Sequence, residues 1–128
     1  MRKHYSINIT DYKVLLTINY LNELNYLPSS LGVYKILSGV KDEETEMFQL
    51  CETFQVIVSF TNKKVTRIIN NLVSNGYLKR TYNEIDDDSY YLLTDLGKAS
   101  IENYKKHHKI HLKKHEINKK RSFIKINH

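Results

Sequence analysis

Hydrophobic residues recur every three or four positions in two long segments, the spacing that gives an α-helix one apolar face. The first segment spans 11–25, with Thr10 or Asp11 as its capping residue. The second spans 62–75 and follows the capping residue Thr61. Both segments are predicted to be amphipathic helices. The apolar positions of the second segment are Val65, Ile68, Ile69, Leu72 and Val73.

Proline and glycine residues are few, so their positions divide the remaining sequence clearly. Pro28 and two serines open a helix, SLGVYKILSG, which Gly39 is placed to end in the left-handed conformation. Gly76 ends the later amphipathic helix. The run 41–54 puts acidic residues in the first turn of a third helix, where the helix dipole favours them. The β-branched segment 56–60 is a strand or an extended connector. The apolar stripe of the third helix would be Met47, Leu50, Cys51 and Phe54.

The last third of the pattern predicts a hairpin and a final helix. Segments 77–85 and 89–94 are predicted strands, and the acidic run 86–88 joins them as a turn. Thr94 or Asp95 then caps a helix that begins LGKASIENYKK. The tyrosines of the hairpin, Tyr82, Tyr90 and Tyr91, are interpreted as cross-strand packing rather than as base-stacking groups.

The predicted order is helix, helix, helix, capped helix, hairpin, helix. This order is mainly α with a small β-hairpin and is typical of a winged helix-turn-helix. Residues 1–104 would form this single domain, and 105–128 would be a basic Lys/His-rich tail that extends the last helix or is disordered. The apolar face of 11–25, with Tyr12 and Tyr20, can pack on its own domain or join two chains as a homodimer.

Charge is distributed unevenly along the chain, whose formal net charge is +6. Residues 105–128 hold nine Lys/Arg and one acid, Glu116, whereas residues 1–104 are slightly acidic. No apolar run reaches the ~20 residues that cross a bilayer. No signal peptide is recognisable at the N-terminus, so we expect a cytoplasmic protein.

Few residues indicate catalysis or metal binding. The single cysteine, Cys51, lies in an apolar context and is interpreted as a small buried hydrophobe. His107, His111 and His115 recur every four residues, a spacing that can bind zinc, but a solvated histidine face is the preferred interpretation. We find no nucleophile–base pairing and no glycine-rich phosphate loop. The sequence therefore predicts no cofactor, no metal and no enzymatic activity.

The polar face of the helix 62–75 combines cationic, amide and hydroxyl side chains. Arg67 can donate two hydrogen bonds to guanine, and Asn70 can bridge adenine. Lys64, at the edge of this face, would reach phosphate. An ordinary solvated face is the alternative, but in a winged helix this is the helix that enters the major groove. The predicted contacts on this helix are Lys63, Lys64, Thr66, Arg67, Asn70 and Ser74.

Further phosphate contacts are predicted at the base of the wing and in the basic tail, which would bind DNA without reading its sequence. The predicted partner is DNA in its double-stranded form. These residues are Lys79, Arg80, Lys105, Lys106, Lys109, Lys113, Lys114, Lys119, Lys120 and Arg121.

The acidic turn Asp86, Asp87 and Asp88 is unexpected on a DNA-binding wing, because phosphate repels it. Two explanations stay open. The aspartates can form a polar turn whose side chains cap the backbone. They can also dock something cationic, either a basic partner protein or the basic tail of this same chain.

Three stretches together resemble the RQC domain, the winged helix that follows the motor of RecQ-type helicases: LGVYKILSGVKDEE, LCETFQVIVSFTNKKVTRIINNLVSNGYL and YYLLTDLGKASI. The resemblance covers about 10–104. LGVYKILSG is its more specific part, since many winged-helix regulators share NGYL and LTDLGK. It implies a DNA-binding domain. The chain has no GxxxxGK[ST] phosphate loop and one cysteine, so we expect a stand-alone domain without ATPase activity. Where the family wing often carries a strand-separating aromatic tip, this chain carries 86–88.

Two functions from different classes follow. The first is a non-enzymatic DNA-binding protein, a transcriptional regulator or an accessory factor in DNA metabolism. The alternative is a protein–protein interaction module that keeps the scaffold, an interpretation that the acidic runs 42–46 and 86–88 favour.

Overall fold

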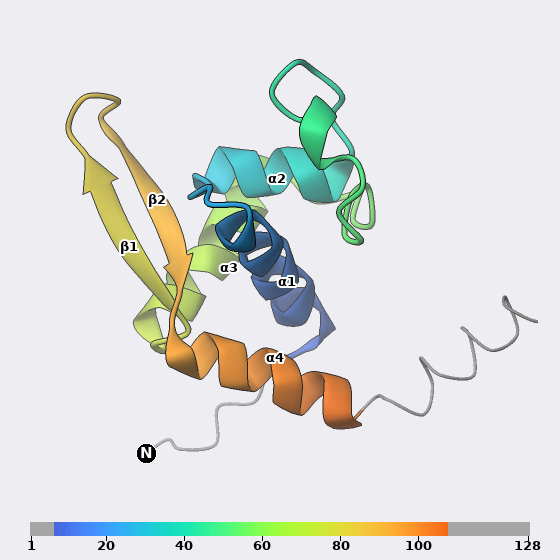
Figure 1. The fold of residues 1–128 in the computed structure, drawn as a ribbon, viewed down its shortest axis with the longest axis vertical. Helices are drawn as coiled ribbons and strands as arrows, with labels where there is room; N and C mark the ends of the chain where they lie inside the picture. The colour runs from blue at the N-terminus through green and yellow to red at the C-terminus, as the bar shows by residue number, and fades with distance from the viewer. Residues whose placement is uncertain (1–6, 108–128) are drawn as a thin grey trace, which may run out of the picture.

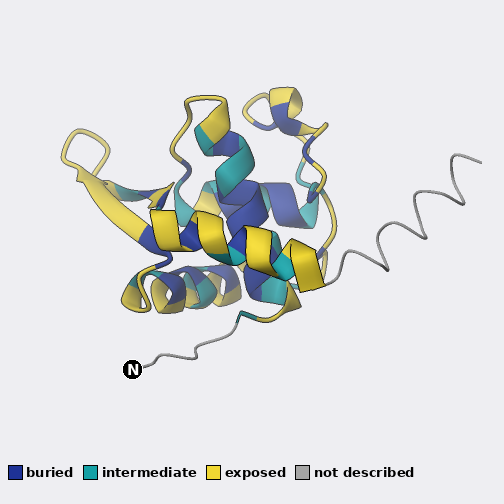
Figure 2. Ribbon diagram, turned by 60° about the horizontal axis from the view of Figure 1, so that its bottom comes forward, coloured by how far each residue is buried: buried dark blue, intermediate teal, exposed yellow. Residues whose placement is uncertain are grey.

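The computed structural model describes residues 7–107, which form a helical bundle with one projecting hairpin (Figure 1). The hairpin extends past the helices on one side, and α4 crosses the bundle at its base. Figure 2 shows the buried residues gathered inside the bundle, with most of the hairpin exposed. The elements are α1 (Ile9–Glu23), α2 (Ser30–Ser38), the 3₁₀ turn η1 (Glu46–Phe48), α3 (Asn62–Ser74), β1 (Leu78–Asn83), β2 (Asp88–Leu93) and α4 (Asp95–His107).

Helix α1 is the centre of the core. Val14, Leu15 and Ile18 are fully buried against the other helices and the hairpin. Tyr12 stacks on Tyr104 of α4, with ring centroids 4.1 Å apart. The wide apolar face predicted here therefore packs on its own domain.

The N-terminal cap of α1 differs from the predicted Thr10 or Asp11. Asn8 is the N-cap, and its side chain accepts from the Asp11 amide at 2.7 Å. The Asp11 carboxylate accepts in return from the Asn8 amide at 3.2 Å, which completes a capping box. The helix therefore begins at Ile9, two residues earlier than predicted.

Helix α2 begins and ends at the residues that the sequence predicted. The Ser29 hydroxyl accepts from the Gly32 amide at 3.2 Å and caps the first turn. Gly39 ends the helix with φ +80°, in the left-handed region. A Cβ at this position would lie 2.5 Å from Cγ of Gln55, so glycine is also required for space.

The helix predicted over 41–54 is wrong. Only η1 and a series of turns form there. Thr45 donates its hydroxyl to the Val40 carbonyl at 2.6 Å, and its amide donates to the Asp42 carboxylate at 3.0 Å. These side-chain to backbone bonds replace helical ones. The predicted stripe is divided as well, because Leu50 is 92% exposed while Cys51 is buried.

Segment 56–60 is a connector without a strand. Backbone hydrogen bonds hold it to the end of α2: the Gln55 amide donates to the Ile36 carbonyl at 2.7 Å, and the Ile57 amide to the Leu37 carbonyl at 2.9 Å. A long irregular segment therefore separates α2 from α3, where helix-turn-helix proteins usually have a short turn. It packs beside α2 on the side away from the hairpin (Figure 1).

The predicted hairpin is present, with slightly shorter strands. Strands β1 and β2 pair antiparallel, from Leu78 opposite Leu93 to Asn83 opposite Asp88. The base of the hairpin is tied to α1, because the Leu93 amide donates to the Asn22 side chain at 2.9 Å. This attachment fixes the direction in which the wing projects.

Helix α4 begins where the sequence indicated. The Thr94 hydroxyl accepts from the Gly97 amide at 3.0 Å and caps the first turn. The helix continues to His107, past the predicted domain boundary at 104. Within residues 7–107, no helix has the length and apolar character that a membrane span requires.

Candidate nucleic-acid interface

Helix α3 exposes the polar face that the sequence predicted. Its N-cap, Thr61, accepts from the Lys64 amide at 3.1 Å. Val65, Ile69 and Leu72 are completely buried and anchor the opposite face in the core. The predicted contacts that are exposed on α3 are Lys63, Lys64, Arg67, Asn70 and Ser74.

Two side chains on this face of α3, Thr66 and Lys64, make contacts within the protein. Thr66 is half-buried, and its hydroxyl bonds to the Asn62 carbonyl at 2.9 Å and to the Ser30 hydroxyl at 3.2 Å. It therefore braces α3 against the start of α2. The Lys64 ammonium lies 4.7 Å from the centroid of the Phe60 ring. This cation–π contact holds its side chain at the N-terminal end of the face.

The base of the wing joins α3 through Arg80. Its guanidinium donates to the Asn70 side-chain carbonyl at 2.6 Å and lies 5.8 Å from the ring centroid of the buried Tyr91. Arg80 and Asn70 therefore form one polar unit across β1 and α3. Lys79 is also exposed, and it points to the other face of the strand because successive side chains alternate.

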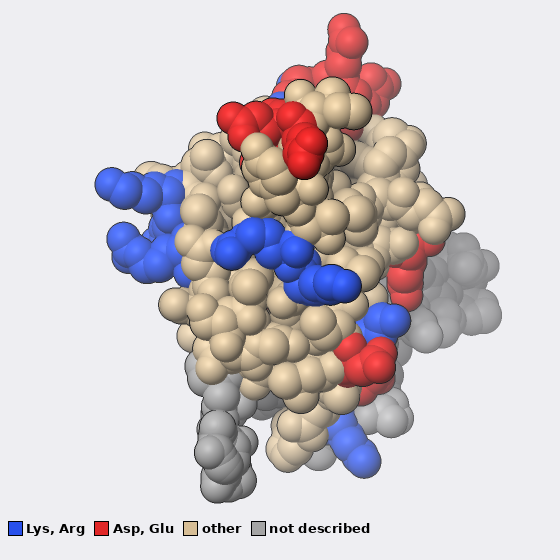
Figure 3. All heavy atoms as spheres, turned by 90° about the vertical axis from the view of Figure 1, so that its left-hand side faces the viewer, with Lys and Arg blue, Asp and Glu red and all other residues tan. Residues whose placement is uncertain are grey.

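Most of the basic side chains on this side of the molecule lie apart from its largest acidic group. Figure 3 shows Lys and Arg across the middle and left edge, a group of Asp and Glu at the upper end, and further acidic side chains beside basic ones at the right. The acidic end comprises the wing turn and the 42–46 loop, which Figure 1 places at the same end of the molecule. A polyanion on α3 would therefore lie away from the acidic end.

The wing turn is built by its own polar side chains. The Asn83 side chain accepts from the Ile85 amide at 2.9 Å, the Asx-turn bond typical of such loops. The Tyr90 hydroxyl donates to the Asp86 carboxylate at 2.5 Å, and Tyr82 donates to Asp87. Asp86 and Asp87 thus take part in forming the turn, through hydrogen bonds from Tyr90 and Tyr82.

These hydrogen bonds shift the acid–base behaviour of the tyrosines. The hydrogen bond to Asp86 is the main reason that the pKa of Tyr90 rises to about 12, with desolvation and the charges of nearby carboxylates adding to it. The hydrogen bond to Asp87 likewise raises the pKa of Tyr82. Both phenols stay protonated at neutral pH.

Sequence reasoning missed Ile85, which is 94% exposed at the wing turn. It was placed within the first strand, but β1 ends at Asn83. The signal was Asn83 itself, a residue that favours turns and whose side chain here bonds the Ile85 amide. The turn of the wing therefore presents the large apolar side chain of Ile85 between acidic neighbours.

The basic tail is only partly described. Lys105 and Lys106 are exposed in the last turn of α4. The other predicted contacts of the tail lie outside the described residues, as do two of the three histidines with four-residue spacing. Within residues 7–107, no group of three or more His, Cys, Asp or Glu side chains is arranged to hold a metal ion. The predicted phosphate contacts of the tail that lie outside residues 7–107 are Lys109, Lys113, Lys114, Lys119, Lys120 and Arg121.

Residues 7–107 contain four helices and a two-stranded wing, and one of these helices, α3, is anchored in the core with an exposed cationic face. This arrangement defines a winged-helix protein with a DNA-binding fold. The family model of the RQC domain matches residues 13–121, so the chain belongs to the RQC domain family, as its motifs predicted. Among solved structures, it is similar to the adhesin competence repressor AdcR from Streptococcus pyogenes, with a TM-score of 0.51 and 15% identity over 93% of this chain and 69% of that one. This likeness confirms the winged helix-turn-helix class. A search of curated proteins gives no match.

Proposed function

We propose that this protein is a non-enzymatic binder of double-stranded DNA, acting as a transcriptional regulator or an accessory factor in DNA metabolism. The observation that carries the proposal is the outward face of α3, where Lys63 and Arg67 are exposed one turn apart on a helix anchored by buried aliphatic residues. A winged helix presents this face to the major groove. The cytoplasmic location expected from the sequence belongs to the same proposal.

Each side chain of the interface has a defined part in this proposal. Arg67 would donate both arms of its guanidinium to guanine O6 and N7. Asn70 has its carbonyl engaged by Arg80, so its amide NH₂ is the group that can donate to a base acceptor. Lys64 and Lys79 would contact phosphates on either side, and the basic tail would add sequence-independent attraction.

Selection of binding sites from a random duplex pool tests this assignment. We expect the native chain to enrich a short motif, and Arg67→Ala to lose preference at one base pair by about 1–3 kcal/mol. Lys98→Ala is the matched control, because Lys98 is an exposed cation on α4, which packs on α1 and β2. Equal enrichment by the native chain and Arg67→Ala would contradict base reading by α3.

A protein–protein interaction module is the second candidate. The acidic end of the molecule favours it, since Glu43 and Glu44 face a groove that Asp88 of the wing also lines. Binding at low salt separates the two functions. A full-length chain that ignores both duplex and single-stranded DNA, although its net charge is +6, would support this second function over the first.

A further inference from the structure

A groove at the acidic end of the molecule is lined by none of the residues that are predicted to contact DNA. It has a volume of about 470 Å³ and lies between the wing, the start of α2 and the irregular segment that contains η1. Its walls come from the loop after α1, from α2, from η1 and from Tyr90 of β2. In Figure 1 the wing and the loop after α1 lie toward one end of α2, and η1 lies above its other end.

The groove exposes large apolar side chains that a folded core would normally bury. Leu27 is 44% exposed, Leu31 46% and Met47 58%. Phe48 forms part of the base of the groove and packs edge-on against Tyr26, with ring centroids 5.3 Å apart. Apolar side chains gathered in a groove, rather than scattered singly, indicate a binding surface.

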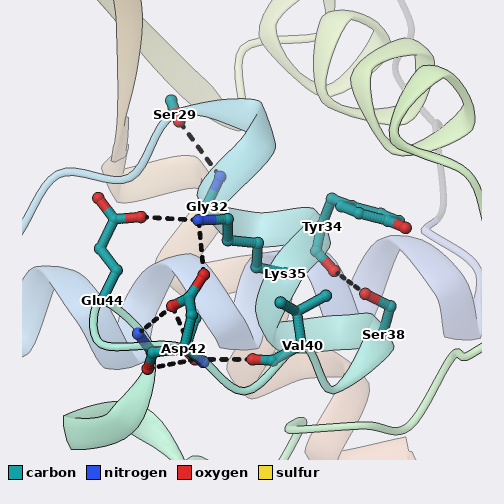
Figure 4. Close-up of polar contacts among 9 residues, drawn as sticks. Ser29, Gly32, Tyr34, Lys35, Ser38, Val40, Asp42 and Glu44 are labelled. Atoms are coloured by element: carbon teal, nitrogen blue, oxygen red, sulfur yellow. Dashed lines mark hydrogen bonds and ion pairs between the residues drawn. The ribbon is translucent and has the colours of Figure 1, made fainter.

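The rim of the groove is negatively charged. Glu43, Glu44 and Asp88 line it, against one cation, Lys35. Lys35 is already paired with Asp42 and Glu44, each at 2.9 Å (Figure 4). These two ion pairs hold the acidic loop against α2. The remaining charge is therefore acidic, and an occupant must combine apolar side chains with positive charge.

We propose that this groove binds the C-terminal segment 108–128 of the same chain. That segment has the required composition, with apolar residues such as Leu112 and Phe123 set between lysines and histidines. Its Lys and Arg outnumber its single acid, Glu116. The rim and the segment are therefore complementary in charge, and the groove supplies pockets for the apolar side chains.

Length and tethering favour this occupant over a separate partner. In extended form, a segment of this length reaches about 70 Å, which exceeds the diameter of a domain whose radius of gyration is about 13 Å. A groove this small gives weak affinity on its own. A tethered segment meets its site at an effective concentration of about millimolar, so a weak contact is enough to fill the groove.

Spin-label NMR on the full chain tests the proposal without DNA, so its outcome does not depend on the proposed function. Ser122→Cys introduces the site for a nitroxide label, and Cys51 is 4% exposed and stays unreacted. We expect the amide signals of Leu31, Glu43 and Met47 to lose most of their intensity at low salt. The signals should recover at about 1 M salt, where the Debye length is about 3 Å.

Matched surface variants identify the groove as the site. Glu43→Lys with Met47→Ser should remove the attenuation, because the first reverses a rim charge and the second removes an exposed apolar side chain. Glu23→Lys with Leu50→Ser makes the same chemical changes at exposed positions outside the groove and should leave the attenuation unchanged.

Three outcomes would overturn the proposal. The first is that the groove amides keep their intensity at low salt. The second is that the groove variant is attenuated as strongly as the native chain. The third is that the attenuation appears when a labelled chain is mixed with a separate isotope-enriched chain, which would show docking between copies rather than within one.

Discussion

At the wing turn, single side chains rather than strand pairing determine the local shape. The loop between β1 and β2 includes Asp87, a non-glycine residue with φ +55°. Aspartate tolerates the left-handed region, and here the hydroxyl of Tyr82 also holds its carboxylate. Asp86 and Asp87 are thus explained by hydrogen bonding and backbone geometry, and the Asp88 carboxylate accepts from the Ser89 amide at 2.8 Å.

The titration of Tyr90 is the first prediction. Its pKa should be about 12, because its phenol O–H donates a hydrogen bond to the Asp86 carboxylate and this bond favours the protonated form. This raised pKa means that the contribution of the pair to stability is complete below the ordinary tyrosine pKa, near 10.0, and is lost as the pH rises through about 12. The ¹³Cζ shift of Tyr90 measures the titration.

Asp86→Asn is the test variant for that titration, since it removes the charge and keeps the side-chain size. The pKa of Tyr90 should fall toward its ordinary value in this variant. A native Tyr90 that titrates near 10.0, or an Asp86→Asn variant that leaves its pKa unchanged, would show that the hydrogen bond is not formed in solution.

The second prediction concerns Gly97, where α4 passes the end of β2. A Cβ there would lie 2.3 Å from the Tyr77 carbonyl oxygen and 2.8 Å from Leu93. We expect Gly97→Ala to destabilise the fold by about 1–3 kcal/mol, because backbone must move to relieve the overlap. Urea unfolding followed by circular dichroism measures the loss.

Gly32→Ala is the control for this glycine. Its added Cβ would meet nothing closer than 3.7 Å, and it lies in the first turn of α2. Alanine at such a compatible position stabilises by about 0.4–1 kcal/mol. If both variants changed stability equally, close approach at Gly97 would not explain its glycine.

At the scale of elements, local signals were sufficient wherever the chain carried its own cap. Ser29, Thr61 and Thr94 each accept from a backbone amide three residues later, so α2, α3 and α4 begin where the sequence indicated. The hairpin of the wing could be predicted equally well, because two segments rich in strand-forming residues flank a polar turn. These elements depend on neighbours within a few residues, and such neighbours are visible in sequence.

The helix prediction for 41–54 was wrong because the conformation of this segment depends on residues distant in the sequence. Its acids suit a helix N-terminus, but Lys35 of α2 binds Asp42 and Glu44 instead. Thr53 bonds to Thr17 of α1 across the core. Prediction of the candidate interface has the same limit. The exposure of Lys63 and Arg67 could be predicted from helical periodicity. The Asn70–Arg80 hydrogen bond could not, because it depends on how the wing packs against α3.

The third prediction tests the polar link between α1 and this segment. Thr17 is fully buried, and its hydroxyl contacts the Lys13 carbonyl at 2.8 Å and the Thr53 hydroxyl at 2.5 Å. Thr17→Val keeps the shape and leaves the buried Thr53 hydroxyl without this partner. We expect a loss of about 1–3 kcal/mol in the free energy of unfolding.

Amide hydrogen exchange would locate the effect of Thr17→Val, because residues 45–57 should lose protection before α3 does. Ser38→Ala is a control of similar chemistry, since the Ser38 hydroxyl donates to the Tyr34 carbonyl one helical turn earlier, at 2.7 Å. A loss of protection spread evenly over the whole core would argue against a specific link.

At the scale of the molecule, the fold separates two chemistries. One part of the surface carries the cations of α3 and the wing base, and the upper end carries acids around an apolar groove (Figure 3). The net charge of +6 hides this separation, since residues 105–128 carry all of the excess and residues 1–104 are slightly acidic. Long-range attraction to DNA and local orientation on it would therefore come from different parts of the chain.

The last prediction measures that division by the salt dependence of duplex binding. Each phosphate contact contributes about 0.9 to the slope of log affinity against log salt. Lys64→Gln with Lys79→Gln should therefore reduce the slope by about 1.8 and should keep the sequence preference that Arg67 provides. Replacing Lys119, Lys120 and Arg121 with Gln should flatten the slope without changing the preferred sequence.

Lys98→Gln is the control outside the interface, and it should change neither the salt slope nor the preferred sequence. A slope that falls equally in all three variants would mean that attraction to DNA depends on net charge rather than on this surface.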